Sequence, residues 1–98
     1  ITSASNNTAV GASSLQNNTT GTQNTAMGTN ALFTNITASN STAFGYNALT
    51  LNTANQNSAF GSLSLASNTT GTQNTAFGYN TLNAIGTSSS CTAVGLTL

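Results

Sequence analysis

The sequence predicts an all-β fold, a parallel β-solenoid (β-roll) of about six coils of 16–17 residues that associates into an oligomer. Three observations predict it. A short Thr-Ala-apolar-Gly motif recurs six times, and its glycines are 17, 17, 16, 17 and 17 residues apart. Helical repeats usually need 30 or more residues. Asn, Thr and Ser supply 49 of the 98 residues, and proline is absent. Seventeen such residues suffice for two short strands and their turns.

The motif and a following leucine define the coil. The copies are Thr8–Gly11, Thr25–Gly28, Thr42–Gly45, Ser58–Gly61, Thr75–Gly78 and Thr92–Gly95, and the leucines, four residues after each of the first five glycines, are Leu15, Leu32, Leu49, Leu65 and Leu82. Thr-Ala-Phe-Gly alternates with the period of a strand, which places Thr and Phe on one face and Ala and Gly on the other. We expect residues 1–98 to form a single repeat region.

Each position of the motif predicts one column of stacked side chains. An invariant alanine indicates a face too tight for a larger side chain, and the glycine permits a bend or a close backbone approach. These structural columns are Ala9, Ala26, Ala43, Ala59, Ala76 and Ala93, and Gly11, Gly28, Gly45, Gly61, Gly78 and Gly95. The residue between them is always apolar and is predicted to fill the core, as Val10, Met27, Phe44, Phe60, Phe77 and Val94.

A polar column precedes the predicted strands. It consists of Asn7, Asn24, Ser41, Asn57, Asn74 and Cys91. Stacked Asn side chains can hydrogen-bond along a solenoid as amide ladders do in cross-β structures. Cys91, the single cysteine, interrupts this ladder, and it is either a small buried side chain or an intermolecular bridge.

The segment between the leucine and the next Asn column has the composition of a loop. The one 16-residue spacing arises from a residue missing between Leu49 and Asn57. Loops tolerate such length changes at little cost. We therefore expect residues 17–23 and 68–73 to be largely exposed.

The composition excludes most chemistry. The chain contains no Lys, Arg, Asp, Glu or His, so it lacks the usual general acids and bases and the usual metal ligands. Nucleic-acid binding usually needs cationic side chains to neutralise the phosphates, and the chain has none. No apolar run reaches the length needed to span a membrane. We expect no enzyme activity, no catalytic residue, no cofactor, no metal site, no nucleic-acid binding and no membrane insertion.

The small apolar core of each coil predicts that the chain associates with copies of itself. Each coil offers about one Leu and one other large apolar side chain to the core, and no disulfide framework or metal site adds stability. We therefore expect a homo-oligomer, either a trimer or an end-to-end filament.

The repeat Asn-Thr-Ala-(Val/Phe)-Gly-x-x-(Ala/Ser)-Leu resembles the head repeats of YadA-like trimeric autotransporter adhesins. It is also similar to the β-solenoid shafts of phage and giant-virus tail or surface fibres. The resemblance extends from about Asn6 to Leu98. It implies an extracellular structural or adhesive module on a virion or cell surface, with a host glycan or receptor as a further partner. The start at Ile1 favours a fragment of a longer fibre protein.

Two other functions fit the sequence. An ice-binding solenoid would use regular Thr-rich faces, but Thr-x-Thr occurs only at Thr20–Thr22 and Thr70–Thr72, while the strand motif gives one hydroxyl per coil. A filament assembled end to end is the other alternative. Tyr46 and Tyr79 are either sugar-stacking platforms or packing residues. Sequons such as those at Asn18, Asn35 and Asn68 are expected by chance in this composition.

Stability should be nearly independent of pH. Only groups whose proton binding differs between the folded and unfolded states make stability vary with pH, and this chain has no carboxylate side chain and no histidine. Thermal unfolding midpoints should therefore be flat from about pH 4 to 7, with little effect of salt, and trypsin should find no site. A steep acid transition would contradict this prediction.

Overall fold

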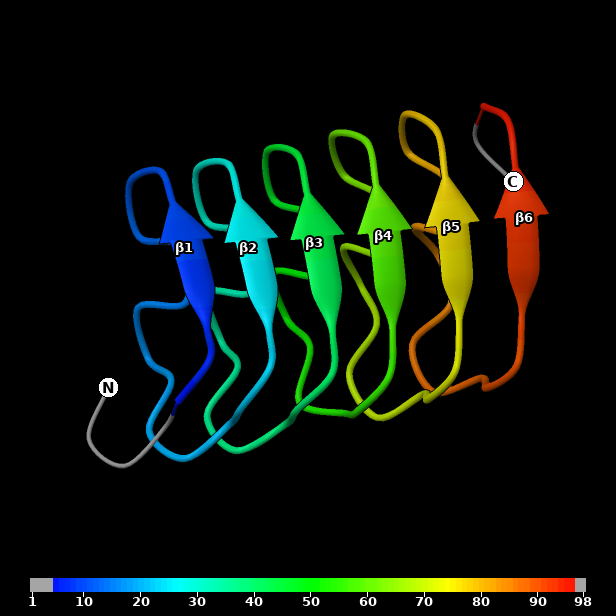
Figure 1. The fold of residues 1–98 in the computed structure, drawn as a ribbon. Coiled ribbons are helices and arrows are strands. Elements are labelled where there is room, and N and C mark those ends of the chain that lie inside the picture. The colour runs from blue at the N-terminus through cyan, green and yellow to red at the C-terminus, as the bar shows by residue number, and fades with distance from the viewer. Residues whose placement is uncertain (1–4, 97–98) are drawn as a thin grey trace.

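The computed structural model describes residues 5–96 and shows a parallel β-solenoid (Figure 1). Its six strands are β1 (Thr8–Val10), β2 (Thr25–Met27), β3 (Thr42–Phe44), β4 (Ser58–Phe60), β5 (Thr75–Phe77) and β6 (Thr92–Val94). They form one sheet in the order β1-β2-β3-β4-β5-β6, and every neighbouring pair is parallel. No helix occurs in the described part of the chain. The predicted all-β solenoid class is confirmed.

Neighbouring coils stack with like residues over like. Ala26 pairs with Ala43, and Ala43 pairs with Ala59, across the shorter coil as well as the regular one. Backbone bonds continue beyond the strands: the Leu32 N–H donates to the Ala48 carbonyl at 3.1 Å. Five turns of chain link the six strands, and the molecule has principal extents of 35 × 23 × 16 Å.

Left-handed residues make the corners of each coil. In the coil that begins at β3 these are Gly45 (φ 139°), Asn47 (φ 56°), Leu49 (φ 51°) and Gln56 (φ 65°). The glycine column is also sterically required. A Cβ on Gly61, for example, would lie 2.5 Å from the carbonyl oxygen of Gly78. Both the backbone conformation and the close approach of the next coil therefore restrict this position to glycine.

The interior is a narrow column of leucine and alanine. Leu15, Leu32, Leu49 and Leu65 are at most 1% exposed, and Ala26, Ala43, Ala59 and Ala76 are fully buried. Leu82 is partly buried against this cluster. The leucine and inner alanine columns thus form the core.

The prediction that the second apolar column fills the core is wrong. Val10, Phe44, Phe77 and Val94 are 45–70% exposed, and Met27 and Phe60 are partly exposed. In a three-residue strand only the central side chain points inward, and that residue is alanine. The interior behind it is already filled by leucine, so the larger apolar side chains lie outside.

The predicted exposure of residues 17–23 and 68–73 is only partly right. Asn18, Gly21, Asn68 and Gly71 are buried. A Cβ on Gly21 would approach the Ala38 carbonyl oxygen to 2.2 Å, so this turn also packs tightly against the next coil.

Two leucines of one coil test this assignment of the core. Leu49 is fully buried, whereas Leu51, two residues later, is 47% exposed. Leu49→Ala should destabilise the protein by about 2–5 kcal/mol because it opens a cavity in a packed column. Leu51→Ala should change stability by about 0.5 kcal/mol or less. Chemical denaturation measures both, and equal effects would refute the assignment.

Candidate interaction surface

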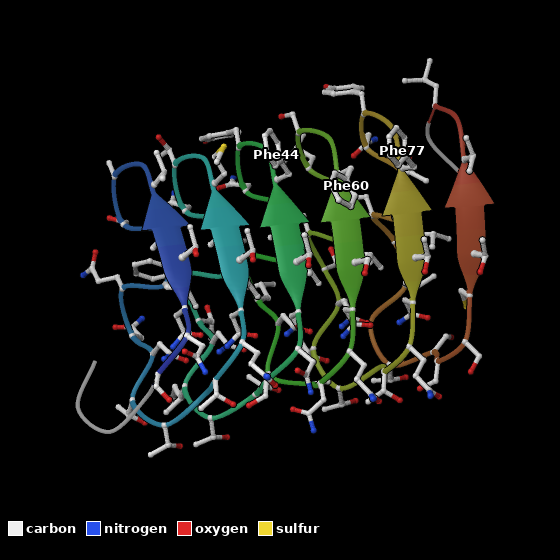
Figure 2. The ribbon with its side chains drawn as sticks, viewed as in Figure 1. Phe44, Phe60 and Phe77 are labelled. Carbon is white, nitrogen blue, oxygen red and sulfur yellow. The ribbon has the colours of Figure 1, made fainter. Side chains whose placement is uncertain are left out.

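The outer face of the six-stranded sheet combines a polar column with an apolar one. The first and third residues of each strand point outward, so a Thr or Ser and a Val, Met or Phe lie on this face in every coil. Phe44, Phe60 and Phe77, from β3, β4 and β5, follow one another along it (Figure 2). We call the column Val10, Met27, Phe44, Phe60, Phe77 and Val94 the apolar stripe.

The three phenyl rings of the stripe stack on one another. The ring centroids of Phe44 and Phe60 are 6.0 Å apart with an interplanar angle of 17°, and those of Phe60 and Phe77 are 5.3 Å apart at 23°. Aromatic pairs at such distances attract each other beyond their burial. Each ring therefore covers part of its neighbour's face.

A column of hydroxyls, one Thr or Ser per strand, lies beside the stripe. Within residues 5–96 the side chains of Thr25, Thr42, Ser58 and Thr75 form no hydrogen bond. Tyr46 and Tyr79 follow two residues after Phe44 and Phe77 and are 52% and 56% exposed. Packing within the chain thus leaves both tyrosines at the surface.

The predicted polar column forms a hydrogen-bonded ladder whose bonds run from side chain to backbone. The Oδ1 atoms of Asn24, Asn57 and Asn74 accept from the backbone N–H of Ser41, Asn74 and Cys91 at 3.0, 3.0 and 2.8 Å. Their Nδ2 groups donate to backbone carbonyls of the following coil, for example from Asn57 to Gly71 at 2.8 Å. This column therefore positions the strands.

Cys91 continues this ladder through its backbone only. Its thiol is free and half-buried, and its Sγ lies 3.7 Å from the Ser89 carbonyl oxygen. The structure therefore places its side chain outside the fully buried core.

A second buried amide column was missed by the sequence reasoning. Asn18, Asn35, Asn52 and Asn68 are at most 1% exposed. Asn35 donates to Asn18 Oδ1 at 2.9 Å, and Asn68 donates to Asn52 Oδ1 at 2.9 Å. Each lies three residues after a column leucine, a fixed spacing that could have revealed it.

The shorter coil breaks this second column at one point. Asn18, Asn35 and Asn68 each donate to a carbonyl three residues ahead, but Asn52 donates to Ala54, only two residues ahead, at 2.7 Å. Asn52 then makes no bond to Asn35, whose buried Oδ1 has no partner within residues 5–96. The missing residue is thus absorbed by one tighter turn.

The asparagines of the three glycosylation sequons are buried in the structure. Asn18, Asn35 and Asn68 are fully enclosed with their amides hydrogen-bonded. A glycan on any of them would require the coil to open, so these three sites are unsuited to glycosylation in the folded protein.

No group of His, Cys, Asp or Glu among residues 5–96 could hold a metal ion. The described residues also contain no helix that is long and apolar enough to cross a membrane. Comparison with family models, curated proteins and solved structures finds no match.

The burial of the ladder can be tested by replacing one of its amides with a carboxyl group, because the stability of the variant should then depend on pH. Asn57 is fully buried and donates two hydrogen bonds, to Gly71 O and Asn52 Oδ1. In Asn57→Asp, burial beside these oxygens should raise the folded-state pKa of the carboxyl above its unfolded value of about 3.9. The variant should be most stable below about pH 4 and lose stability as pH rises through the folded-state pKa.

At pH 7 the loss should reach about 3 kcal/mol or more, because an unpaired charge is buried. The control is Asn17→Asp at an exposed position, where the amide makes one bond to Phe33 O. Thermal melts from pH 3 to 8 should show a pH-dependent midpoint for Asn57→Asp and a nearly flat one for the control. A flat profile for both variants would contradict the ladder.

Proposed function

We propose that this protein is a structural module of a fibre on a virion or cell surface, in which the solenoid serves as a shaft made of self-associating copies. One observation carries the proposal: successive coils repeat the same kinds of contact, through paired strands, a leucine column and an amide ladder, with one break at the shorter coil. Because such a solenoid is stabilised by nearest-neighbour contacts, its length can be set by the number of coils.

The side chains available also favour a structural role. Half the sequence is Asn, Thr and Ser, and no acid, base or cation is present for catalysis or for binding charged ligands. An extracellular fibre needs rigidity under changing pH and salt, which an uncharged, hydrogen-bonded rod supplies. The exposed rings of Tyr46 and Tyr79 offer platforms for an adhesive contact with a host glycan.

The duplicated segment of the sequence permits a clean test of the shaft. Residues 18–26 and 68–76 are identical, so a second copy of residues 24–73 can follow Gln73 without changing either junction. These three added coils should lengthen the particle by about 14 Å at the usual strand spacing without lowering its unfolding midpoint.

Small-angle scattering and negative-stain microscopy measure the length. The control is an insertion of the same residues in scrambled order, which should form no additional coils. If the particle grew in width instead of length, or lost its cooperative unfolding transition, the proposal that the solenoid is a shaft would be wrong.

Ice binding is the alternative, and the hydroxyl column favours it because its members are exposed (Thr8, Thr75, Thr92) or partly exposed (Thr25, Thr42, Ser58). This column gives one free hydroxyl per coil, flanked by phenyl rings instead of a second threonine. A thermal-hysteresis measurement decides the question: freezing-point depression without a matching change in melting point would favour ice binding, and its absence at high protein concentration would exclude it.

A further inference from the structure

We propose that the outer sheet face, centred on the apolar stripe, is the surface through which copies of this chain bind one another. The inference deepens the proposed shaft by naming its subunit interface. The stripe is continuous over all six strands, because parallel in-register pairing brings each apolar residue beside the next.

The stripe exposes apolar side chains from one end of the sheet to the other. Phe44 and Phe77 are each about half exposed, and at about 150–250 Å² per aromatic side chain they present roughly 200 Å². Val10 and Val94, which are 53% and 70% exposed, extend the stripe to β1 and β6. The largest apolar patch of a monomer is usually about 300–600 Å², and a stable interface uses about 800 Å² per partner. The stripe therefore supplies the apolar centre of such an interface, and the polar side chains around it supply the remaining area.

Charge and periodicity identify the partner as a second copy. The chain carries no charged side chain, so two copies meet without like-charge repulsion and without burying an unpaired charge. The stripe repeats once per coil at the strand spacing, and an identical chain carries the same repeat. A partner of unrelated structure would match this repeat only by coincidence.

The hydroxyl column fits the same interface. Thr25, Thr42, Ser58 and Thr75 border the stripe with side chains that bond to no described residue of their own chain. They can exchange hydrogen bonds with a facing chain or with bridging water, which gives the interface a polar rim beside an apolar centre.

Analytical ultracentrifugation of paired variants tests the proposal. The stripe variant is Phe44→Ser with Phe77→Ser; the control is Ile36→Ser with Leu51→Ser, which removes two equally exposed apolar side chains outside the strands. The unmodified chain should associate, the stripe variant should dissociate with a Kd raised by about 30-fold or more, and the control should retain the parental Kd.

Thiol labelling supplies a second readout, which reports whether the sheet face is covered and does not depend on the number of subunits. In a Cys91→Ser background, Thr42→Cys should react with maleimide more slowly in the oligomer than in the diluted monomer. Thr37→Cys, at an exposed loop position, should react equally fast in both.

The outcomes are distinct. An unmodified chain that stays monomeric at about 100 μM, or equal dissociation of both paired variants, would overturn the interface. The three-coil insertion would still report on the shaft, because a monomeric rod lengthens as an oligomeric one does. Circular dichroism confirms that the variants are folded. If Thr42→Cys reacted equally fast in the associated and the diluted sample, association would lie on another face and the proposal would be overturned.

Discussion

The structure depends on the hydrogen bond that each ladder asparagine accepts, through its Oδ1, from a backbone N–H of the next coil. Asn24 accepts from Ser41, and Asn57 accepts from Asn74, immediately before the strands begin. These bonds are fully buried, so a slip by one residue would leave a ladder amide and a backbone N–H unpaired, at about 1–3 kcal/mol for each group. The ladder therefore fixes the register that the short strands alone could not fix.

This register determines what the surface looks like. With alanine over alanine and leucine over leucine, the interior is full, and no coil has space inside for a phenyl ring. The aromatic residues then stack with each other along the outer face. A buried ladder of amides and an exposed ladder of rings are thus two results of the same one-to-one stacking.

The repeat itself was predictable, because spacing between identical motifs is visible in a sequence. The glycine, alanine and leucine columns and the parallel order follow from it. The assignment of Phe44 and Phe77 to the core failed because alternation separates two faces without showing which encloses the narrower space. The column at Asn18 and Asn35 was missed because asparagine is abundant in every loop, so the spacing from leucine was obscured by composition.

The irregular coil shows which part of the repeat can vary. Its lost residue falls between Asn52 and Asn57, and the tighter turn there leaves Asn35 Oδ1 without a partner among residues 5–96. The Gly45-to-Leu49 segment keeps its length, and its left-handed Leu49 remains fully buried. Holding leucine in that conformation costs roughly 1–2 kcal/mol, which burying its side chain offsets by about 1.5–3 kcal/mol. The length of the coil can therefore change in the turn after the leucine, which side-chain hydrogen bonds close. It cannot change in the Gly-to-Leu segment, where a left-handed backbone is held by a buried leucine.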